Sequence, residues 1–171
     1  RDDDGKPFVL GCVREAERRV AELDHEYAGI GGVPRFTELV KALQLGECSP
    51  VLEQRVAARA VTVQALSGTG ALRVAAEFLL RHLRLSGKAP SAVHVPTPTW
   101  ANHIPLFRDS HLDVKTYRYY DPSTCLLDFD GMLADVRAAP EQSFFLLHAC
   151  AHNPTGVDPT PQQWQIGRAH V

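Results

Sequence analysis

Features that would indicate several classes of protein are missing from this 171-residue sequence. It contains no block of like charge, and its formal net charge is only -2, so nucleic acid and anionic membranes are poor candidates for partners. No apolar run approaches the ~20 residues that span a membrane. The four cysteines form no CxxC pair, which argues against a zinc site and favours reduced thiols in an intracellular protein.

The start of the sequence carries little information about compartment. It opens with Arg1-Asp2-Asp3-Asp4-Gly5, which is typical of a turn, and not with methionine. The lack of a visible targeting peptide therefore excludes no compartment. At the other end the helical pattern is lost over residues 166–171, and we expect a truncated or non-native tail there.

Apolar periodicity predicts helices and strands that alternate along the chain. The predicted helices cover residues 9–23, 36 to about 46, 72–83, 101–107 and 129–138. The predicted strands cover residues 61–66, 92–95, 114–119 and 143–148. A further helix is expected to begin within 158–164, with Pro159 or Pro161 in its first turn, and residues 53–59 are interpreted as a short connection.

Alternating strands and helices predict an α/β fold with a mostly parallel sheet flanked by helices. Residues 1–165 are interpreted as part of one domain. Residues 144–147 are all apolar, as in a strand covered on both faces.

Ser67-Gly68-Thr69-Gly70 stands between a predicted strand and a predicted helix. Free amides at a helix N-terminus, together with two hydroxyls, could hold a phosphate group. A simple helix cap made by Ser67 or Thr69 is the alternative. The segment is not a P-loop, because no Lys-Ser/Thr follows, and it lacks the third glycine of a dinucleotide-binding loop.

Trp100 and His103 follow the carboxyl end of a predicted strand, which is where open α/β sheets bind ligands. The indole could stack on a flat heteroaromatic ring, and His103 could hydrogen-bond a carboxylate or orient another group. Core packing of Trp100 and a surface position for His103 are equally good interpretations.

The segment from His148 to Gly156 also follows a predicted strand. Asn153 precedes a proline, so its amide is expected in a loop, where it could donate to an oxygen anion. His148, Cys150 and His152 alternate, but a metal site is disfavoured because no fourth ligand has suitable spacing. A Cys150/His148 nucleophile pair is equally weak.

Four segments together resemble the aspartate aminotransferases, which are fold-type I enzymes that use pyridoxal phosphate. The resemblance lies in residues 65–73 (ALSGTGALR), 98–103 (PTWANH), 117–122 (YRYYDP) and 148–159 (HACAHNPTGVDP), and it runs in order from Arg1 to about Gln165. It implies that the chain is part of the large, cofactor-binding domain of such an enzyme.

The resemblance also implies roles for individual residues. Ser67, Gly68 and Thr69 would bind the cofactor phosphate. Trp100 would stack on the pyridine ring, and Asn153 would donate to its phenolate oxygen; both would also contact the substrate carboxylate.

Three further residues acquire roles only through the resemblance. His103 and His148 would support an aspartate that pairs with the ring nitrogen. Tyr27, which spacing alone assigns to simple packing, would reach the phosphate in the neighbouring subunit of a homodimer.

The implied reaction converts L-aspartate and 2-oxoglutarate to oxaloacetate and L-glutamate. It needs a lysine bonded to the cofactor, and none of the four lysines present, Lys6, Lys41, Lys88 and Lys115, stands in the family's sequence context. We therefore expect the 171-residue chain alone to be inactive. Residues 1–7 and 119–122 resemble mitochondrial forms more than animal cytosolic ones, so the mitochondrial matrix is favoured over the cytoplasm.

Two other classes of function can be compared with the enzyme. A non-catalytic binding or interaction protein could retain half of the pocket. An NAD-linked oxidoreductase is disfavoured by the missing third glycine and by the lack of a suitably placed acidic residue after the first strand and helix.

Overall fold

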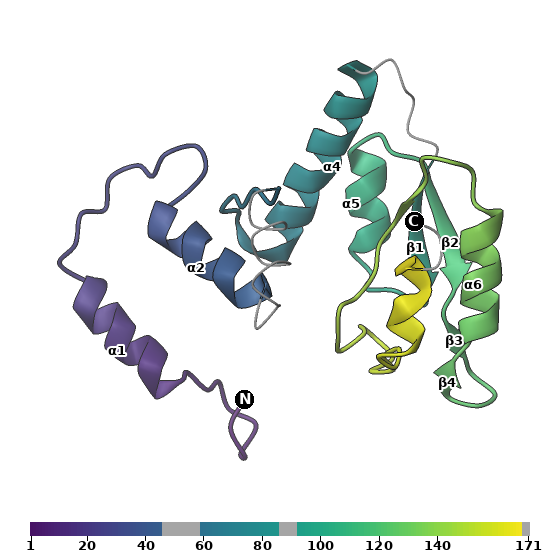
Figure 1. The fold of residues 1–171 in the computed structure, drawn as a ribbon. Helices are drawn as coiled ribbons and strands as arrows, with labels where there is room; N and C mark the ends of the chain where they lie inside the picture. The colour runs from purple at the N-terminus through teal and green to yellow at the C-terminus, as the bar shows by residue number, and fades with distance from the viewer. Residues whose placement is uncertain (46–58, 86–91, 169–171) are drawn as a thin grey trace. The chain divides into compact units, whose positions relative to one another are not determined.

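The computed structural model describes residues 1–45, 59–85 and 92–168, which fall into two compact units, residues 1–64 and residues 65–171 (Figure 1). Most of the predicted connection at 53–59 and the last three residues of the tail lie outside the described residues. Each unit is described by itself.

The first unit contains helices α1 (Gly11–Val20) and α2 (Pro34–Leu45), which confirms the two helices predicted there. No residue of α1 is buried. After the break between the helices, the backbone amide of Gln64 donates to the carbonyl of Gly31 at 3.0 Å, and its side-chain oxygen accepts from the Val33 amide at 3.0 Å. Gly32 has a φ of +94°, and a Cβ there would collide with the Gln64 side chain. The close approach of Gln64 to this segment therefore requires glycine at position 32.

The strand predicted at residues 61–66 is wrong. The segment pairs with no other strand in the described part of the chain, and Val61 and Val63 are 90% and 50% exposed. β-branched residues favour a strand, but a strand is stable only where a neighbour satisfies its backbone groups.

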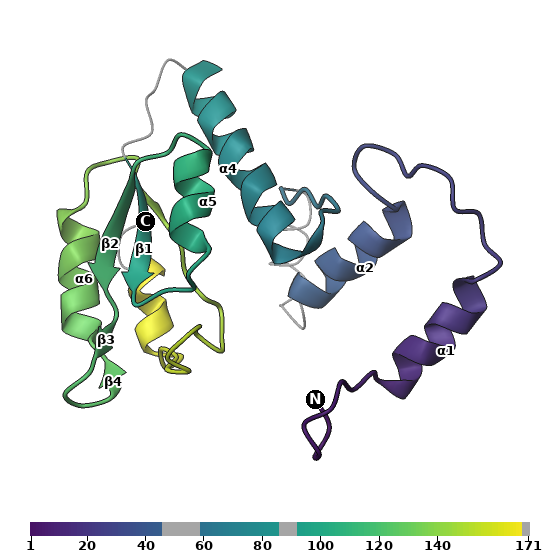
Figure 2. The ribbon, with the colours of Figure 1, turned by 180° about the vertical axis from the view of Figure 1, so that it is seen from behind.

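The second unit is built on a three-stranded parallel sheet in the order β2 (Val114–Arg118), β1 (Val93–Thr97) and β5 (Phe144–Phe145). Figure 2 labels β1 and β2 of this sheet. Val93 of the central strand is opposite Val114 on one side and Phe144 on the other. The expected α/β fold with a parallel sheet is confirmed.

Three helices accompany this sheet: α4 (Ser67–Leu85), α5 (His103–Asp109) and α6 (Phe129–Ala138). Side chains of α4, β1 and α5 form the main core, including Leu80, Val95 and Phe107. Burying a side chain of this size stabilises the fold by roughly 1.5–3 kcal/mol. Helix α6 has the predicted bounds, and Asp128 caps its first turn by accepting from the Gly131 amide at 2.9 Å.

The structure departs from the sequence prediction toward the C-terminus. Strand β5 is shorter than predicted. The half-buried Phe144 and Phe145 pack against different core clusters, whereas Leu147 is 48% exposed, so the expected cover reaches only the first part of the predicted strand. A helix does begin within 158–164, at Gln163, but its type differs from the prediction and neither Pro159 nor Pro161 lies in its first turn. A 3-10 helix η1 (Gln163–Arg168) forms instead, because Pro159 and Pro161 disfavour helical geometry in the residues before them.

A small hairpin was not predicted. Strands β3 (Tyr120–Asp121) and β4 (Leu126–Leu127) pair antiparallel around a turn. The Asp121 carboxylate accepts from the Ser123 amide at 2.9 Å and the Ser123 hydroxyl at 2.7 Å, which stabilises that turn. None of the described helices is both long and apolar enough to cross a lipid bilayer.

Candidate cofactor site

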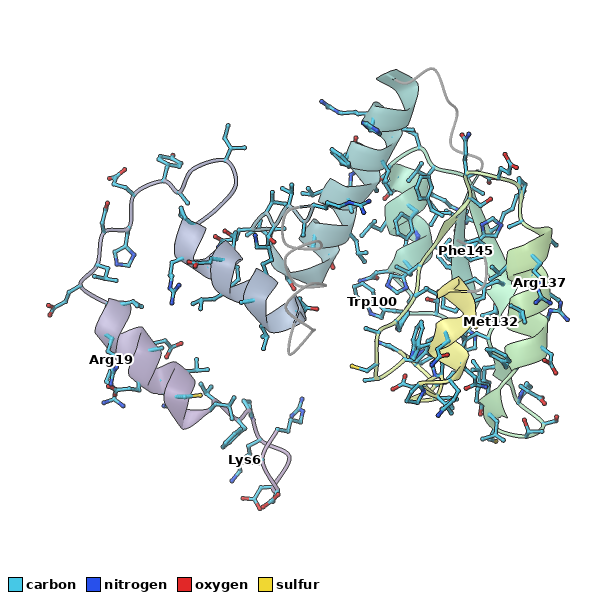
Figure 3. The ribbon with its side chains drawn as sticks, in the orientation of Figure 1. Lys6, Arg19, Trp100, Met132, Arg137 and Phe145 are labelled. Carbon is cyan, nitrogen blue, oxygen red and sulfur yellow. The ribbon has the colours of Figure 1, made fainter. Side chains whose placement is uncertain are left out.

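The loops that follow β1 and β5 meet at the carboxyl end of the sheet. The first loop carries Trp100 and leads into His103, the first residue of α5; the second carries His148 and Asn153. Figure 3 labels Trp100, beyond β1, and Phe145, on β5. The two sequence-predicted groups therefore lie at the ligand-binding edge of a parallel sheet.

Five ring side chains connect these loops, and we call them the aromatic row: Trp100, His103, His148, His152 and Tyr119. The first pair is edge-to-face, with centroids 5.2 Å apart and planes at 81°. The His103–His148 pair has the same geometry at 5.3 Å and 83°. The row continues with His148 and His152 at 4.4 Å and 37°, and ends with His152 stacked on Tyr119 at 3.9 Å and 14°.

His103 is buried, which makes the surface interpretation of this residue wrong. Its Nδ1 lies 2.7 Å from the Thr99 hydroxyl oxygen. Burial lowers the pKa of His103, and the neighbouring His148 lowers it further. A neutral His103 can accept or donate one hydrogen bond at each ring nitrogen, as an orienting residue requires.

His148 has a defined tautomer. Its Nδ1 accepts from the backbone amide of Asn153 at 3.2 Å, so the neutral ring carries its proton on Nε2. Burial lowers the pKa of His148, which favours this neutral form. The Nε2 atom is buried and has no protein partner among the described residues, so it is a donor free to bond to a further group.

The loop containing Asn153 is stabilised by hydrogen bonds to its own backbone. The Asp158 carboxylate accepts from the amides of Ala151 at 2.7 Å and His152 at 2.9 Å. The His152 carbonyl accepts from the Gly156 amide at 2.7 Å, and Gly156 has a φ of +68° that suits glycine. The Asn153 side chain is exposed and makes no hydrogen bond within the described structure, so its NH₂ group is free to donate.

Sequence reasoning missed the position of His152. It treated His148, Cys150 and His152 as alternating along a strand, but β5 ends at Phe145 and the chain turns through Ala151, whose φ is +52°. Cys150 is consequently exposed while His152 is 1% exposed. Among the described residues, no group of three or more His, Cys, Asp or Glu side chains is arranged to hold a metal ion.

Ser67, Gly68 and Thr69 form the first turn of α4. The Gly70 amide donates to the Leu66 carbonyl at 3.0 Å, whereas amides earlier in a helix have no acceptor within it. Neither hydroxyl makes a hydrogen bond in the described structure, so a simple side-chain cap is not formed. No atom lies within 4 Å of a Cβ built on Gly68, which leaves the turn open to a ligand.

The start of α4 and the carboxyl end of β1 lie at the same end of the second unit in both views (Figures 1 and 2). No hydrogen bond or ring contact between described residues joins this turn to Trp100 or Asn153. Tyr27 belongs to the first unit and is fully exposed, so its interpretation as a packed aromatic is wrong within the described structure.

Comparison with known proteins assigns the chain to a family. Residues 1–167 match the sequence profile described as Aminotransferase class I and II. The chain belongs to the class I and II aminotransferases. This aminotransferase sequence is 53% identical over 168 residues to the mitochondrial aspartate aminotransferase of Dictyostelium discoideum, and 51% identical over 167 residues to that of Gallus gallus.

These matches cover 96% of the chain but only 37% and 38% of the two relatives. Among solved structures, the cytoplasmic aspartate aminotransferase of Saccharomyces cerevisiae matches with a TM-score of 0.85 and 41% identity, over 97% of the chain and 39% of its own length. An aromatic-amino-acid aminotransferase from Burkholderia pseudomallei, covalently bound to pyridoxal phosphate, matches with a TM-score of 0.86 and 39% identity, over 99% and 42%.

The residues of this chain suit parts of pyridoxal phosphate. The open first turn of α4 suits a phosphate, and the half-buried Trp100 offers an indole held by His103. The free amide of Asn153 suits a ring oxygen, and the buried Nε2 of His148 suits a carboxylate or other acceptor.

Proposed function

We propose that this chain supplies the phosphate-, ring- and oxygen-binding part of the pyridoxal phosphate site of an aspartate aminotransferase. The enzyme would transfer the amino group of L-aspartate to 2-oxoglutarate, giving oxaloacetate and L-glutamate. The observation that carries this proposal is the aromatic row, because it joins the loop of Trp100 to the loop that presents the free amide of Asn153. Aspartate aminotransferases at 51–53% identity support the substrate class.

Pyridoxal phosphate, when bound, supplies an electron sink for bond breaking at the substrate α-carbon. The residues of this chain hold and tune it. The amides and hydroxyls of Ser67 to Thr69 receive the phosphate, assisted by the positive end of the α4 dipole. Trp100 covers one face of the ring, and Asn153 donates to the ring oxygen and reaches the substrate carboxylate.

His103 and His148 act on the cofactor indirectly, through another side chain. The His148 Nε2–H donor and the neutral His103 ring are suited to orient a carboxylate that pairs with the ring nitrogen. Because burial favours the neutral form of both imidazoles, they can do so without adding positive charge.

A chimera tests this proposal. Residues 1–167 of this chain would replace the matching segment of the Dictyostelium discoideum enzyme, whose remaining residues supply the rest of the protein. We expect the purified chimera to bind pyridoxal phosphate and to convert aspartate. If it bound the cofactor without turnover, the alternative of a non-catalytic binding protein would be favoured instead.

Asn153→Ala in the chimera should lower kcat at least about tenfold, since one charge-assisted hydrogen bond is lost, while cofactor content stays stoichiometric. Asn102→Ala is the matched control, because Asn102 is also exposed but caps no helix with its side chain. Equal activities of the two variants would show that Asn153 has no role at the cofactor site.

We infer that Tyr27 acts across a homodimer, on the phosphate bound to the neighbouring subunit. Its fully exposed phenol, with no partner in the described part of its own unit, supports a contact with another chain. Mixing chimeric chains that carry Tyr27→Ala with chains that carry Asn153→Ala creates hybrid dimers with one intact site. Random reassortment should then restore about a quarter of the unmutated activity; no restoration would mean that both residues serve the same subunit.

We further propose the mitochondrial matrix as the compartment, with the cytoplasm as the alternative. Curated relatives at 51–53% identity are mitochondrial enzymes, whereas the yeast structure at 41% identity is cytoplasmic. Fractionation of cells that express the natural gene, followed by immunoblotting, distinguishes the two.

A further inference from the structure

His152 has no place in the cofactor contacts proposed above, yet it is the most fully buried of the site histidines. Its ring is stacked on Tyr119 and lies 4.4 Å from the ring of His148. Its Nδ1 lies 2.8 Å from the hydroxyl oxygen of Thr155. That same oxygen accepts from the Val157 amide at 3.2 Å.

These contacts surround the turn that carries Asn153. The backbone of His152 is bonded at both ends, by its amide to Asp158 and by its carbonyl to Gly156. The Tyr119 hydroxyl donates to the Val157 carbonyl at 2.6 Å, which holds the far side of the turn. Asn153 follows directly and donates its own amide to His148.

We propose that His152 is a positioning residue, which fixes the 152–157 turn through its contact with Thr155 and its stack on Tyr119 and thereby aims Asn153 at the cofactor. This inference rests on the proposed function only in taking the cofactor as the group that Asn153 contacts. The contacts of the turn themselves can be tested without cofactor.

Simple core packing does not explain an imidazole at this position. An apolar side chain could fill the same space without the cost of burying a polar atom, and His152 leaves its Nε2 without a partner in the described structure. The feature that an apolar residue lacks is the Nδ1 contact to Thr155. The imidazole combines that contact with a flat face for Tyr119.

Burial and the neighbouring histidines favour the neutral form of His152. The ring of His148 lies 4.4 Å away and contacts His103 in turn, Tyr119 stacks on the ring, and the Asp158 carboxylate accepts from the His152 backbone amide. Burial, and then His148, lower the pKa of His152 to about 4, although Asp158 opposes the shift. At neutral pH the ring is therefore free to accept from or donate to Thr155.

Amide hydrogen exchange measured by NMR on the full 171-residue chain, without cofactor, tests the proposal. His152→Phe keeps a flat ring against Tyr119 but loses the bond to Thr155. We expect the Asn153 amide to exchange at least about tenfold faster in this variant, as loss of a stabilising hydrogen bond predicts. The His148 ring ¹⁵N shifts should also lose the Nε2–H signature.

His152→Asn supplies the rescue. Its amide can reach Thr155 as Nδ1 does, so Asn153 exchange should return toward the original rate. Thr155→Val removes the same bond from the other side, together with the bond from the Val157 amide, so it should raise Asn153 exchange at least as much as His152→Phe does, even if the phenylalanine variant fails to fold. The Val93 amide, which donates to Asp113 in the sheet, reports whether the fold is intact.

Unchanged Asn153 exchange in His152→Phe and Thr155→Val, with the Val93 amide protected, would overturn the proposal. So would an Asn variant that behaves like the Phe variant. In the chimera, the Phe variant should lower kcat while cofactor content is kept, and the Asn variant should recover part of the loss. An inactive unmutated chimera would count against the proposed function alone, because the exchange results do not depend on it.

Discussion

The imidazole of His152 lies flat against the phenol ring of Tyr119, with centroids 3.9 Å apart and planes 14° apart. Tyr119 stands between β2 and β3, and His152 stands in the loop after β5, so the pair joins two segments far apart in sequence. The Tyr119 hydroxyl adds a bond to the Val157 carbonyl at 2.6 Å. This one tyrosine therefore holds the Asn153 loop by both its ring and its hydroxyl.

Substitutions at Tyr119 should separate these two contributions. Tyr119→Phe loses the hydroxyl bond and should reduce the free energy of unfolding by about 1 kcal/mol. Tyr119→Leu also loses the ring stack and should cost roughly 1 kcal/mol more. Urea unfolding of the 171-residue chain measures both, with the fully exposed Tyr27→Phe as the control expected to show no change. A Leu variant as stable as the Phe variant would show that the stack contributes nothing.

Acid should destabilise the second unit in a defined pH window. The pKa of His152 is lowered to about 4, so the unfolded chain takes up this proton near pH 6.5 while the folded chain does not. The unfolded state then binds more protons between about pH 6.5 and 4, and the free energy of unfolding falls as pH falls through that range. Backbone hydrogen bonds lower the pKa of Asp158. The stabilisation that its carboxylate provides is therefore lost only as the pH falls below the ordinary pKa of about 4.

Urea unfolding at a series of pH values between 7 and 4 measures this dependence. His152→Phe has no titrating group at the position, so its stability should fall less steeply over the same range. His103 and His148, whose pKa values are also lowered, remain in both proteins, so part of the fall should persist in the variant. If the free energy of unfolding fell equally steeply with pH in the two proteins, His152 would not be a buried neutral ring.

The ion pair between Arg118 and Asp135 should contribute a small, salt-dependent stabilisation. The guanidinium donates to both carboxylate oxygens, at 2.7 and 3.0 Å, and the Arg118 backbone amide donates at 2.8 Å, which joins β2 to α6. These bonds lower the pKa of Asp135. Asp135→Asn should therefore lower the unfolding midpoint slightly, and the effect should shrink in high salt.

The pair of Arg35 with Glu38 is the control, since it has a single short contact between two well-exposed side chains. Glu38→Gln should leave the midpoint unchanged. Equal effects of the two substitutions would mean that the bidentate geometry of the Arg118–Asp135 pair adds nothing.

The 171-residue chain alone should not transaminate. Lys6, which pairs with Asp4 at 3.6 Å in the N-terminal turn, and Lys41, on α2, belong to the first unit, and Lys115 of the second unit is exposed on β2. Lys88 lies outside the described residues. Borohydride reduction with stoichiometric pyridoxal phosphate, followed by mass spectrometry, should label no single lysine specifically, whereas the chimera should be labelled at one. Aspartate turnover by the pure chain would contradict this prediction.

Local sequence signals predicted the parts of the fold that depend on local contacts. Helix α6 was predicted with its observed bounds, because its apolar spacing lies within the segment itself. Trp100 and His148 were placed at one sheet edge by the general rule for parallel strands, and the structure brings their loops together through His103.

Features that depend on distant partners could not be predicted in the same way. Residues 61–66 have the composition of a strand but no ladder partner in the described chain. His152 gave no signal of burial, because its place depends on Tyr119 and on a turn made possible by positive φ angles at Ala151 and Gly156. The free Nε2 of His148 likewise follows from a backbone amide that only the folded loop brings to its Nδ1.

A crystal structure of the chimera loaded with pyridoxal phosphate would show whether these residues hold the cofactor as proposed. We expect the phosphate at the first turn of α4, against Ser67 to Thr69, the pyridine ring against Trp100, and the ring oxygen at the Asn153 side-chain amide. A cofactor whose phosphate is held elsewhere, or whose ring contacts neither Trp100 nor Asn153, would contradict it.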